Sequence, residues 1–280
     1  MKLGMHVSIK GSVDMAVDRA KEKGCNTFQI FTRNPRGWKF KDLTEEEVRG
    51  FTAKRREYGI EPAIAHMPYL PNLASPKDDV YTKSVYALTA ELKRCELLEI
   101  PYLVTHLGSH LGAGMERGFK RITEAIRRGL SEAGGGVMLL LETTAGTKNS
   151  MGGRFEDIAH IIELLEGDER LGVCFDTCHA FAAGYDLRTE DAVDETAKNF
   201  DEVIGLRRLK VVHVSDCQGD LNSRLDRHEH VGMGFIGDDG FRAVLRHNAL
   251  RELPFILETP IDARRDDYGN LEKLRELSPK

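Results

Sequence analysis

The segment from Val211 to Gly232, VVHVSDCQGDLNSRLDRHEHVG, concentrates histidine and aspartate in a short part of the chain. A β-branched run, Leu209–Val214, carries His213 near its end, and Asp216 follows soon after. A polar loop then places three more such side chains at alternate positions, Asp226, His228 and His230. Imidazole and carboxylate groups are ligands for zinc, manganese and iron. This segment alone leaves two interpretations equally open: a metal site beside a buried strand, or a solvated loop with a core histidine.

The unit in this segment, a short apolar run followed by a polar loop and an amphipathic stretch of helical length, repeats along the chain. The eight runs are Leu3–Val7, Thr27–Phe31, Pro62–Ala65, Tyr102–Thr105, Val137–Leu141, Leu171–Phe175, Leu209–Val212 and Pro254–Leu257. Predicted helices cover residues 12–23, 78–98, 115–132, 154–166, 190–204, 239–247 and 271–277. Ser12 and Gly24 are the expected caps of the first helix. Thr44 and Glu47 form a capping box that starts another.

Apolar strands that alternate with helices are typical of parallel strands buried on both faces. Eight such units predict an α/β fold, a (β/α)8 TIM barrel, as a single domain over residues 1–280. A doubly wound open sheet is the alternative. The first strand is followed by no G-x-G-x-x-G pattern, so nothing in the sequence favours a dinucleotide-binding fold.

Composition and charge narrow the class of protein. The chain is 41% hydrophobic and 30% charged, which is typical of a globular protein. No apolar run reaches the roughly 18 residues of a membrane helix, and the N-terminus lacks the apolar core of a secretory signal. Five cysteines without a CxxC pair indicate reduced core thiols in a cytoplasmic protein. The net charge of −5 argues against a general nucleic-acid binder, although bound divalent cations would reverse the sign locally.

The predicted strands share a feature at their carboxyl ends. From the third strand to the eighth, they end in His66, His106, Glu142, Asp176, His213 and Glu258. These ends converge on one face of a barrel, where the active sites of this fold lie. Carboxylates and imidazoles directed into one space would be poorly solvated without a cation. A single strand-end histidine is more often a structural residue, but six consecutive strands that follow the same rule predict a metal cluster.

The loops supply further candidates, His179, Asp226 and His228. With them the set has nine members, which is too many for one ion and suits two or three ions with shared carboxylates. Clusters of this kind catalyse phosphoryl-transfer hydrolysis. The other histidines are less clear. His6 is either a residue that supports the ligands or a core residue, and His110 stays ambiguous. His230 is expected to be a solvated loop residue or a DNA contact, and His160 and His247 are expected to be structural.

Motifs along essentially the whole chain resemble the endonuclease IV family, the zinc-dependent apurinic/apyrimidinic endonucleases of DNA base-excision repair. The motifs are GMHVS, HMPYLPNLASP, THLGSH, LLLETTAG, GVCFDTCHAFAAGYD, VVHVSDC, SRLDRHEHVGMGFIG and ILETP. The resemblance implies three zinc ions per chain, with manganese or iron as alternatives. The implied ligand groups are His66, His106 and Glu142; Glu142 again with Asp176, His213 and Glu258; and His179, Asp226 and His228.

The resemblance also implies the reaction. A metal-bound hydroxide would hydrolyse the phosphodiester 5′ to an abasic site in double-stranded DNA, leaving a 3′-hydroxyl and a 5′-deoxyribose phosphate, with Glu142 as a catalytic residue. By motif match, Arg36 and Tyr69 would enter the minor groove at the lesion. The family resemblance suggests a monomer that acts on nucleoid DNA in the cytoplasm. Six basic residues of the predicted loops are candidates for phosphate contacts: Arg33, Lys39, Lys41, Lys148, Arg224 and Arg227.

Three positions depart from the family pattern: Thr143 and Ser215 replace asparagine, and Met233 replaces a glutamate between two glycines. They leave the candidate ligands intact but put metal preference and catalytic rate in doubt. A xylose isomerase-like sugar isomerase or epimerase is the competing enzyme class, although the histidine-rich ligand set and the basic loop after the second strand argue against it. A lesion-binding protein without catalysis is the third alternative. Incision of abasic DNA would indicate the endonuclease, interconversion of a sugar without DNA affinity the isomerase, and binding of abasic DNA without cutting the lesion binder.

Overall fold

The eight predicted runs form the strands of one parallel sheet in the computed structural model, which describes residues 1–279. The strands are β1 (Lys2–Met5), β2 (Phe28–Ile30), β3 (Ala63–His66), β4 (Tyr102–Thr105), β5 (Met138–Glu142), β6 (Leu171–Asp176), β7 (Leu209–Val214) and β10 (Pro254–Leu257). The order of hydrogen-bonded neighbours is β1-β10-β7-β6-β5-β4-β3-β2. Nearly all strand residues are buried, which explains why the runs are apolar on both faces.

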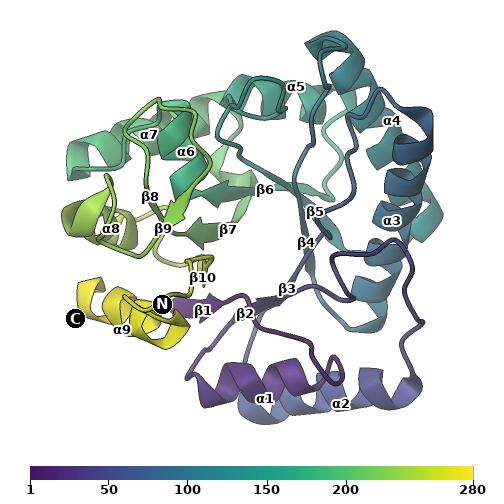
Figure 1. Ribbon diagram of the computed structural model, residues 1–280, viewed down its shortest axis with the longest axis horizontal. Coiled ribbons are helices and arrows are strands. Elements are labelled where there is room, and N and C mark those ends of the chain that lie inside the picture. The colour runs from purple at the N-terminus through teal and green to yellow at the C-terminus, as the bar shows by residue number, and fades with distance from the viewer. Residues whose placement is uncertain (280) are drawn as a thin grey trace.

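The two ends of this sheet meet, because a short parallel bridge joins the segment that follows β1 to strand β2. His6 pairs with Gln29 in this bridge, and the Val7 amide donates to the Gln29 carbonyl at 2.8 Å. On the other side, the His6 amide donates to the Leu257 carbonyl at 3.2 Å. The helices surround the strands as an outer ring (Figure 1). The predicted TIM barrel is therefore confirmed, and the open-sheet alternative is wrong.

The helices of the ring follow the strands in alternation. They are α1 (Met15–Glu22), α2 (Glu45–Tyr58), α3 (Asp78–Leu97), α4 (Met115–Ala133), α5 (Phe155–Leu164), α6 (Thr177–Ala183), α7 (Glu190–Val203), α8 (Gly237–Arg246) and α9 (Asp267–Leu277), with a 3-10 turn at Leu206–Arg208. Among residues 1–279, no helix combines the length and the apolar character that crossing a membrane requires.

The caps observed for these helices agree only in part with the caps predicted from the sequence. The capping box of α2 is confirmed, since Thr44 accepts a hydrogen bond from the Glu47 amide at 3.2 Å and its own amide donates to the Glu47 carboxylate at 2.8 Å. The prediction of Ser12 as N-cap of α1 is wrong. Its hydroxyl donates to Asp14, which is the N-cap, so the helix begins later than expected. Gly24 lies one residue beyond the C-cap with a φ of 71°, where a left-handed residue commonly ends a helix.

Two local elements were not predicted. The helix α6 has seven residues and starts directly at the end of β6, where the Asp176 carboxylate accepts from the His179 amide at 2.8 Å. A segment this short contains too few turns for a periodic apolar pattern to reveal it. A small antiparallel hairpin, β8 (Asp216–Cys217) with β9 (His228–Glu229), lies in the loop between β7 and α8. Both elements position residues of the candidate site.

Candidate metal centre

The floor of the site is an apolar layer inside the barrel. Six buried residues pack together there: Ile64, Val104, Leu140, Cys174, Val211 and Ile256. Each of them lies two residues before one of the six strand-end candidates. Because strand side chains alternate with a period of two, both members of each pair point into the barrel. The apolar layer therefore supports a polar layer directly above it, at the carboxyl ends of the strands.

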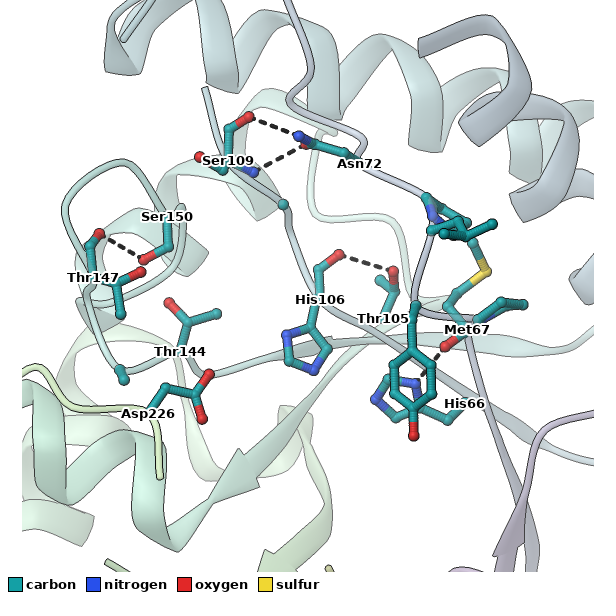
Figure 2. Close-up of a pocket in the computed structure, with 16 residues that line it drawn as sticks. His66, Met67, Asn72, Thr105, His106, Ser109, Thr144, Thr147, Ser150 and Asp226 are labelled. Atoms are coloured by element: carbon teal, nitrogen blue, oxygen red, sulfur yellow. Dashed lines mark hydrogen bonds between the residues drawn. The ribbon is translucent and has the colours of Figure 1, made fainter. Parts of the chain in front are cut away.

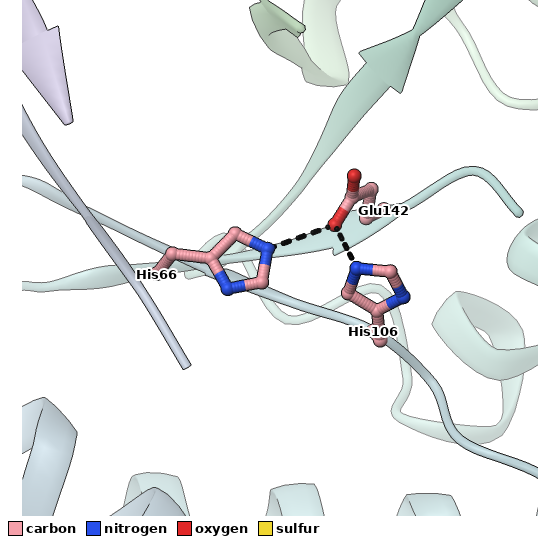
Figure 3. Close-up of side chains that lie close together, drawn as sticks. All are labelled: His66, His106 and Glu142. Carbon is pink, nitrogen blue, oxygen red and sulfur yellow. Dashed lines mark hydrogen bonds and ion pairs between the residues drawn. The ribbon is translucent and has the colours of Figure 1, made fainter. Parts of the chain in front are cut away.

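The first group of that polar layer is His66, His106 and Glu142 (Figure 3). The two imidazoles come from β3 and from the residue after β4, and Glu142 ends β5. One carboxylate oxygen of Glu142, Oε2, lies 3.1 Å from Nε2 of His66 and 3.1 Å from Nε2 of His106. Three possible ligand atoms from three strands thus converge on one point, as the sequence predicted.

The second group uses the other oxygen of the same carboxylate. Glu142 Oε1 lies 3.0 Å from Nδ1 of His213, and the ligand atoms of Asp176 and Glu258 complete this group within 4.8 Å of one another. Glu142 has no solvent exposure, so both of its oxygens are committed to the cluster. A carboxylate between two groups can bridge two cations.

The third group comes from α6, from the loop that leads into β9, and from the first residue of β9. His179 Nε2 lies 3.2 Å from Asp226 Oδ1 and 3.3 Å from His228 Nε2. A fourth, overlapping group contains Cys178 with Asp176 and His228. The structure therefore brings all nine predicted side chains together, in the three groupings that the resemblance implied.

Most of these histidines hold their outer ring nitrogen in a hydrogen bond. For three of them the acceptor is a backbone carbonyl: His66 Nδ1 donates to Met67 at 2.7 Å, His179 Nδ1 to Thr143 at 2.9 Å, and His228 Nδ1 to Glu258 at 2.8 Å. The inner nitrogen of each ring faces the cluster, where its lone pair would be available to a bound cation. Metal-binding histidines nearly always show this arrangement, which fixes the tautomer and the orientation of the ring.

The carboxylates of the cluster are held in the charged form by neighbouring imidazoles. Burial disfavours ionisation of Glu142, but the imidazoles of His106 and His213 outweigh burial and keep the pKa of Glu142 well below its usual range. Burial also raises the pKa of Glu258, and the charge of His213 more than reverses that effect, bringing the pKa to about 2. The cluster therefore needs positive charge to stay buried.

In the third group, burial and the neighbouring charges also act on the pKa values in opposite directions. A hydrogen bond from His179 lowers the pKa of Asp226 to about 2. Burial lowers the pKa of His179, but Asp176 and Asp226 outweigh it and raise this pKa to about 10. Without a metal, a proton on His179 compensates these carboxylates. A divalent cation would supply the same compensation and release that proton.

One carboxylate oxygen of Asp176 indicates that a cation fits the cluster. Asp176 Oδ2 is buried and lacks a hydrogen-bond partner among the described residues. It lies 4.0 Å from His213 Nδ1 and 3.9 Å from His228 Nε2, between the second and third groups. An unpaired buried carboxylate oxygen is costly, and coordination to a cation would satisfy it. The donor set of imidazoles and carboxylates is the one that zinc, manganese and iron accept.

The cluster opens into a cleft. A cavity of about 460 Å³ is lined by His66, His106, His179, Asp226, His228 and Glu258, among others. A second cavity of about 380 Å³ adjoins it and extends between the β3–α3 loop and the segment 144–150 (Figure 2). Tyr69 borders both cavities, is 69% exposed, and packs edge-on against Phe31 at 5.0 Å between ring centroids. Arg36 is also exposed, on the loop after β2.

Two of the sequence predictions about contact residues are wrong. Arg33 is buried and pairs with Glu91 of α3, so it is not available for a phosphate, whereas the other five basic candidates are exposed. His230 is also buried, with Nε2 at 3.1 Å from Asp262 and Nδ1 accepting from Asn270 at 2.9 Å. His230 therefore attaches the loop after β9 to the C-terminal segment and is neither solvated nor placed to contact DNA.

Two side chains support the cluster in ways that the sequence did not reveal. Gln29 of β2 is fully buried and contacts both His213 and Glu258. Thr143, one of the departures from the family pattern, accepts the Asp176 amide on its hydroxyl at 2.9 Å, and its carbonyl orients His179. Thr143 thus contacts two candidate ligands, one through its side chain and one through its backbone. Among the residues described, all five cysteines are free and buried, which confirms their prediction as core residues.

The closed barrel and the cluster at the carboxyl ends of its strands define the class of this protein: residues 17–277 match the family described as xylose isomerase-like TIM barrels. A 3-keto-D-glucoside 4-epimerase from E. coli has this fold as well, with a TM-score of 0.69 at 16% identity over 99% of this chain and 98% of that one. Within the class, the chain belongs to the endonuclease IV family.

Two relatives establish this membership. The chain is 58% identical over 277 residues to the probable endonuclease 4 of Methanoculleus marisnigri, which covers 99% of this chain and 98% of the relative. The crystal structure of endonuclease IV from Thermus thermophilus matches with a TM-score of 0.88 and 37% identity, over 99% of this chain and 98% of that one. The family resemblance and the expectation of an enzyme are thereby confirmed.

Proposed function

We propose that this protein is a base-excision-repair endonuclease that hydrolyses the phosphodiester 5′ to abasic sites in double-stranded DNA, leaving a 3′-hydroxyl and a 5′-deoxyribose phosphate. One observation carries the proposal: the two oxygens of Glu142 face two different groups of ligand atoms at the base of an open cleft. A shared carboxylate suits a multi-metal centre, which is a tool for phosphodiester hydrolysis. The membership in the endonuclease IV family supports the same reaction.

Nine residues would hold three zinc ions per chain. His66, His106 and Glu142 hold the first; Glu142, Asp176, His213 and Glu258 the second; and His179, Asp226 and His228 the third. These residues would hold zinc where, once bound, it would supply polarisation of a phosphate and a water acidic enough to act as a nucleophile near neutral pH. Manganese or iron would fit the same donors, because the proposed set contains no soft thiolate ligand.

The residues of the chain then orient the cluster and the DNA. Glu142 keeps two groups of ligands at a fixed separation, and the backbone carbonyls behind three of the imidazoles prevent those rings from turning. Tyr69 at the border of the cleft and the exposed Arg36 on the loop after β2 enter the minor groove where a base is missing, since a ring and a guanidinium can fill that gap. The protein acts as a single domain of residues 1–280, as a monomer, in the cytoplasm.

The decisive experiment is incision of a 5′-labelled duplex that carries one abasic site. The protein is tested as isolated, after prolonged chelation, and after zinc is restored, with the metal content per chain counted at each step. We expect cutting 5′ to the site that disappears as about three ions leave and returns with zinc. Bound metal without incision would leave the two competing interpretations, a sugar isomerase, tested by sugar interconversion, and a lesion binder, tested by retention of abasic duplex.

A matched pair of variants assigns the activity to the cluster. Glu142→Gln should lose metal from the two groups that Glu142 joins, and should lose incision as a result. Glu169→Gln removes an exposed carboxylate in the loop before β6, at the opposite end of the barrel, and should retain both. Full metal content and full incision by Glu142→Gln would refute the assignment.

A further inference from the structure

We propose that Gln29 is a positioning residue that selects the tautomer of His213 and orients Glu258, so that both side chains present their ligand atoms to the second metal group. This inference rests on the proposed function only in taking that group as a metal site. Gln29 touches no substrate and acts through the two side chains that it contacts.

The barrel places Gln29 where it can contact residues far away in the sequence. It lies in the middle of β2, with no solvent exposure, at the bridge that closes the barrel between the first two strands. Its backbone carbonyl accepts from the Val7 amide, which makes the closure itself independent of the side chain. The side-chain amide is free to point into the barrel, toward the ends of β7 and β10.

The direction of the Gln29 amide follows from what its neighbours can do. Its Nε2 lies 2.6 Å from Glu258 Oε1, and a carboxylate can only accept, so the NH2 group must face Glu258. The amide oxygen therefore faces His213, whose Nε2 lies 2.8 Å from it. An amide oxygen can only accept, so His213 must carry its proton on Nε2. Nδ1 is then the nitrogen that faces Glu142, 3.0 Å away, and the other carboxylates of the second group, and it would offer its lone pair to a cation bound there.

A third contact uses the remaining amide hydrogen. Gln29 Nε2 lies 3.1 Å from Nδ1 of His6, which therefore accepts. This contact explains the role of His6, which the sequence left open: it is a neutral acceptor that fixes the amide and is not itself placed among the ligands. Burial lowers the pKa of His6 to about 4, which agrees with an uncharged ring.

His213 differs from the other histidines of the cluster in this respect. His66, His179 and His228 donate Nδ1–H to backbone carbonyls and direct Nε2 inward. His213 is reversed, and its outer partner is a side chain. A backbone carbonyl cannot be removed by substitution, whereas Gln29 can, so this position offers a way to change one metal group without changing any ligand.

The test compares Gln29→Met with Thr27→Val in the full-length, zinc-loaded protein. Methionine keeps the length of the side chain and removes both hydrogen-bonding groups. Thr27 is a fully buried residue immediately before β2, where its hydroxyl donates to the Pro62 carbonyl at 2.7 Å. Thr27→Val therefore perturbs the same strand without touching the cluster. Zinc affinity is measured by competition with a coloured chelator, without DNA, and the thermal unfolding of the metal-free proteins is recorded.

We expect one zinc ion per chain to bind Gln29→Met about 10- to 100-fold more weakly, the usual effect of removing a hydrogen-bond partner behind a metal ligand. Thr27→Val should keep the affinity of the wild type for every ion. Equal zinc affinity in Gln29→Met and the wild type, or an equal loss in both variants, would overturn the proposal. These readouts need no incision, so failure of the wild type to cut abasic DNA would refute the proposed reaction and leave this result standing.

A second measurement uses the wild type alone and does not depend on whether a variant folds. Nitrogen-15 NMR of the zinc-loaded protein, with His213 assigned from the signals lost in His213→Gln, should show a proton on its Nε2 and metal on its Nδ1. Coordination of His213 through Nε2 would overturn the proposal.

Discussion

Replacement of Asp216 by asparagine tests how the loop beside the cluster is held. The sequence placed Asp216 among the possible metal ligands of the segment from Val211 to Gly232. In the structure, its carboxylate accepts hydrogen bonds from backbone amides instead. Oδ1 accepts from the amides of Cys217 and Ile236 at 2.8 and 2.9 Å, and Oδ2 accepts from those of Gly232, Gly234 and Gly237 at 3.1, 3.0 and 3.1 Å. Asp216 is fully buried, so water cannot easily replace it.

The cost follows from the number of amides that lose an acceptor. Asparagine has one oxygen in place of two, so at least two of the five N–H groups would face an NH2 group. A buried donor without a partner costs ~1–3 kcal/mol, which predicts a loss of about 2–6 kcal/mol in the free energy of unfolding. A typical domain has only about 5–15 kcal/mol in total, so the change should be large.

The assay is denaturant unfolding of the metal-free protein, followed by far-UV circular dichroism. Metal must be removed because ligands that bind the folded state add their own stabilisation and would mask the change. Asp239→Asn is the matched control, because its side chain is 91% exposed and contacts Arg242. The control should remain within about 0.5 kcal/mol of the wild type. An Asp216→Asn protein as stable as this control would refute the reasoning.

Three further predictions concern the site. Tyr69→Ala should weaken binding of an abasic duplex by about 1–3 kcal/mol, the usual value of a lost stacking contact, with unchanged zinc content; equal binding by both proteins in a gel-shift titration would contradict it. Glu91→Gln should raise KM for that duplex more than it lowers kcat, because Glu91 pairs with Arg33 and so anchors the loop after β2; an unchanged KM would count against this anchor. Glu142→Gln should weaken two zinc sites and Glu258→Gln only one, and identical chelation profiles would argue against the shared carboxylate.

The polar ends of the strands could be predicted because they depend on local spacing and on one rule of topology. His66, His106 and Glu142 each follow a short apolar run, and parallel strands of a barrel bring such positions to one face. The period of two along a strand then directs them inward, above the apolar layer. Neither step needs a contact between particular side chains, so the pattern in the sequence was sufficient.

The misassigned residues depend on contacts between distant segments. The basic loop around Arg33 predicts an exposed side chain, but in the structure Arg33 is buried in an ion pair with Glu91 of α3. His230 followed an exposed stretch, but the C-terminal segment buries it with Asp262 and Asn270. In both cases the partner is tens of residues away, and nothing in the neighbouring sequence indicates it.

The sequence by itself determined the alternation of strands and helices and the nine side chains at the carboxyl ends of the strands and in the following loops, because local periodicity and strand polarity are properties of short segments. The closure of the barrel, which the sequence favoured over an open sheet, depends on the bridge between His6 and Gln29. The tertiary structure alone decided which nitrogen of each histidine faces the cluster, that Asp216 holds a loop, and that Gln29 contacts Glu258 across 229 residues of chain. Hydrogen bonds between groups so far apart form only after the barrel has closed. Their partners are therefore set by packing and not by spacing.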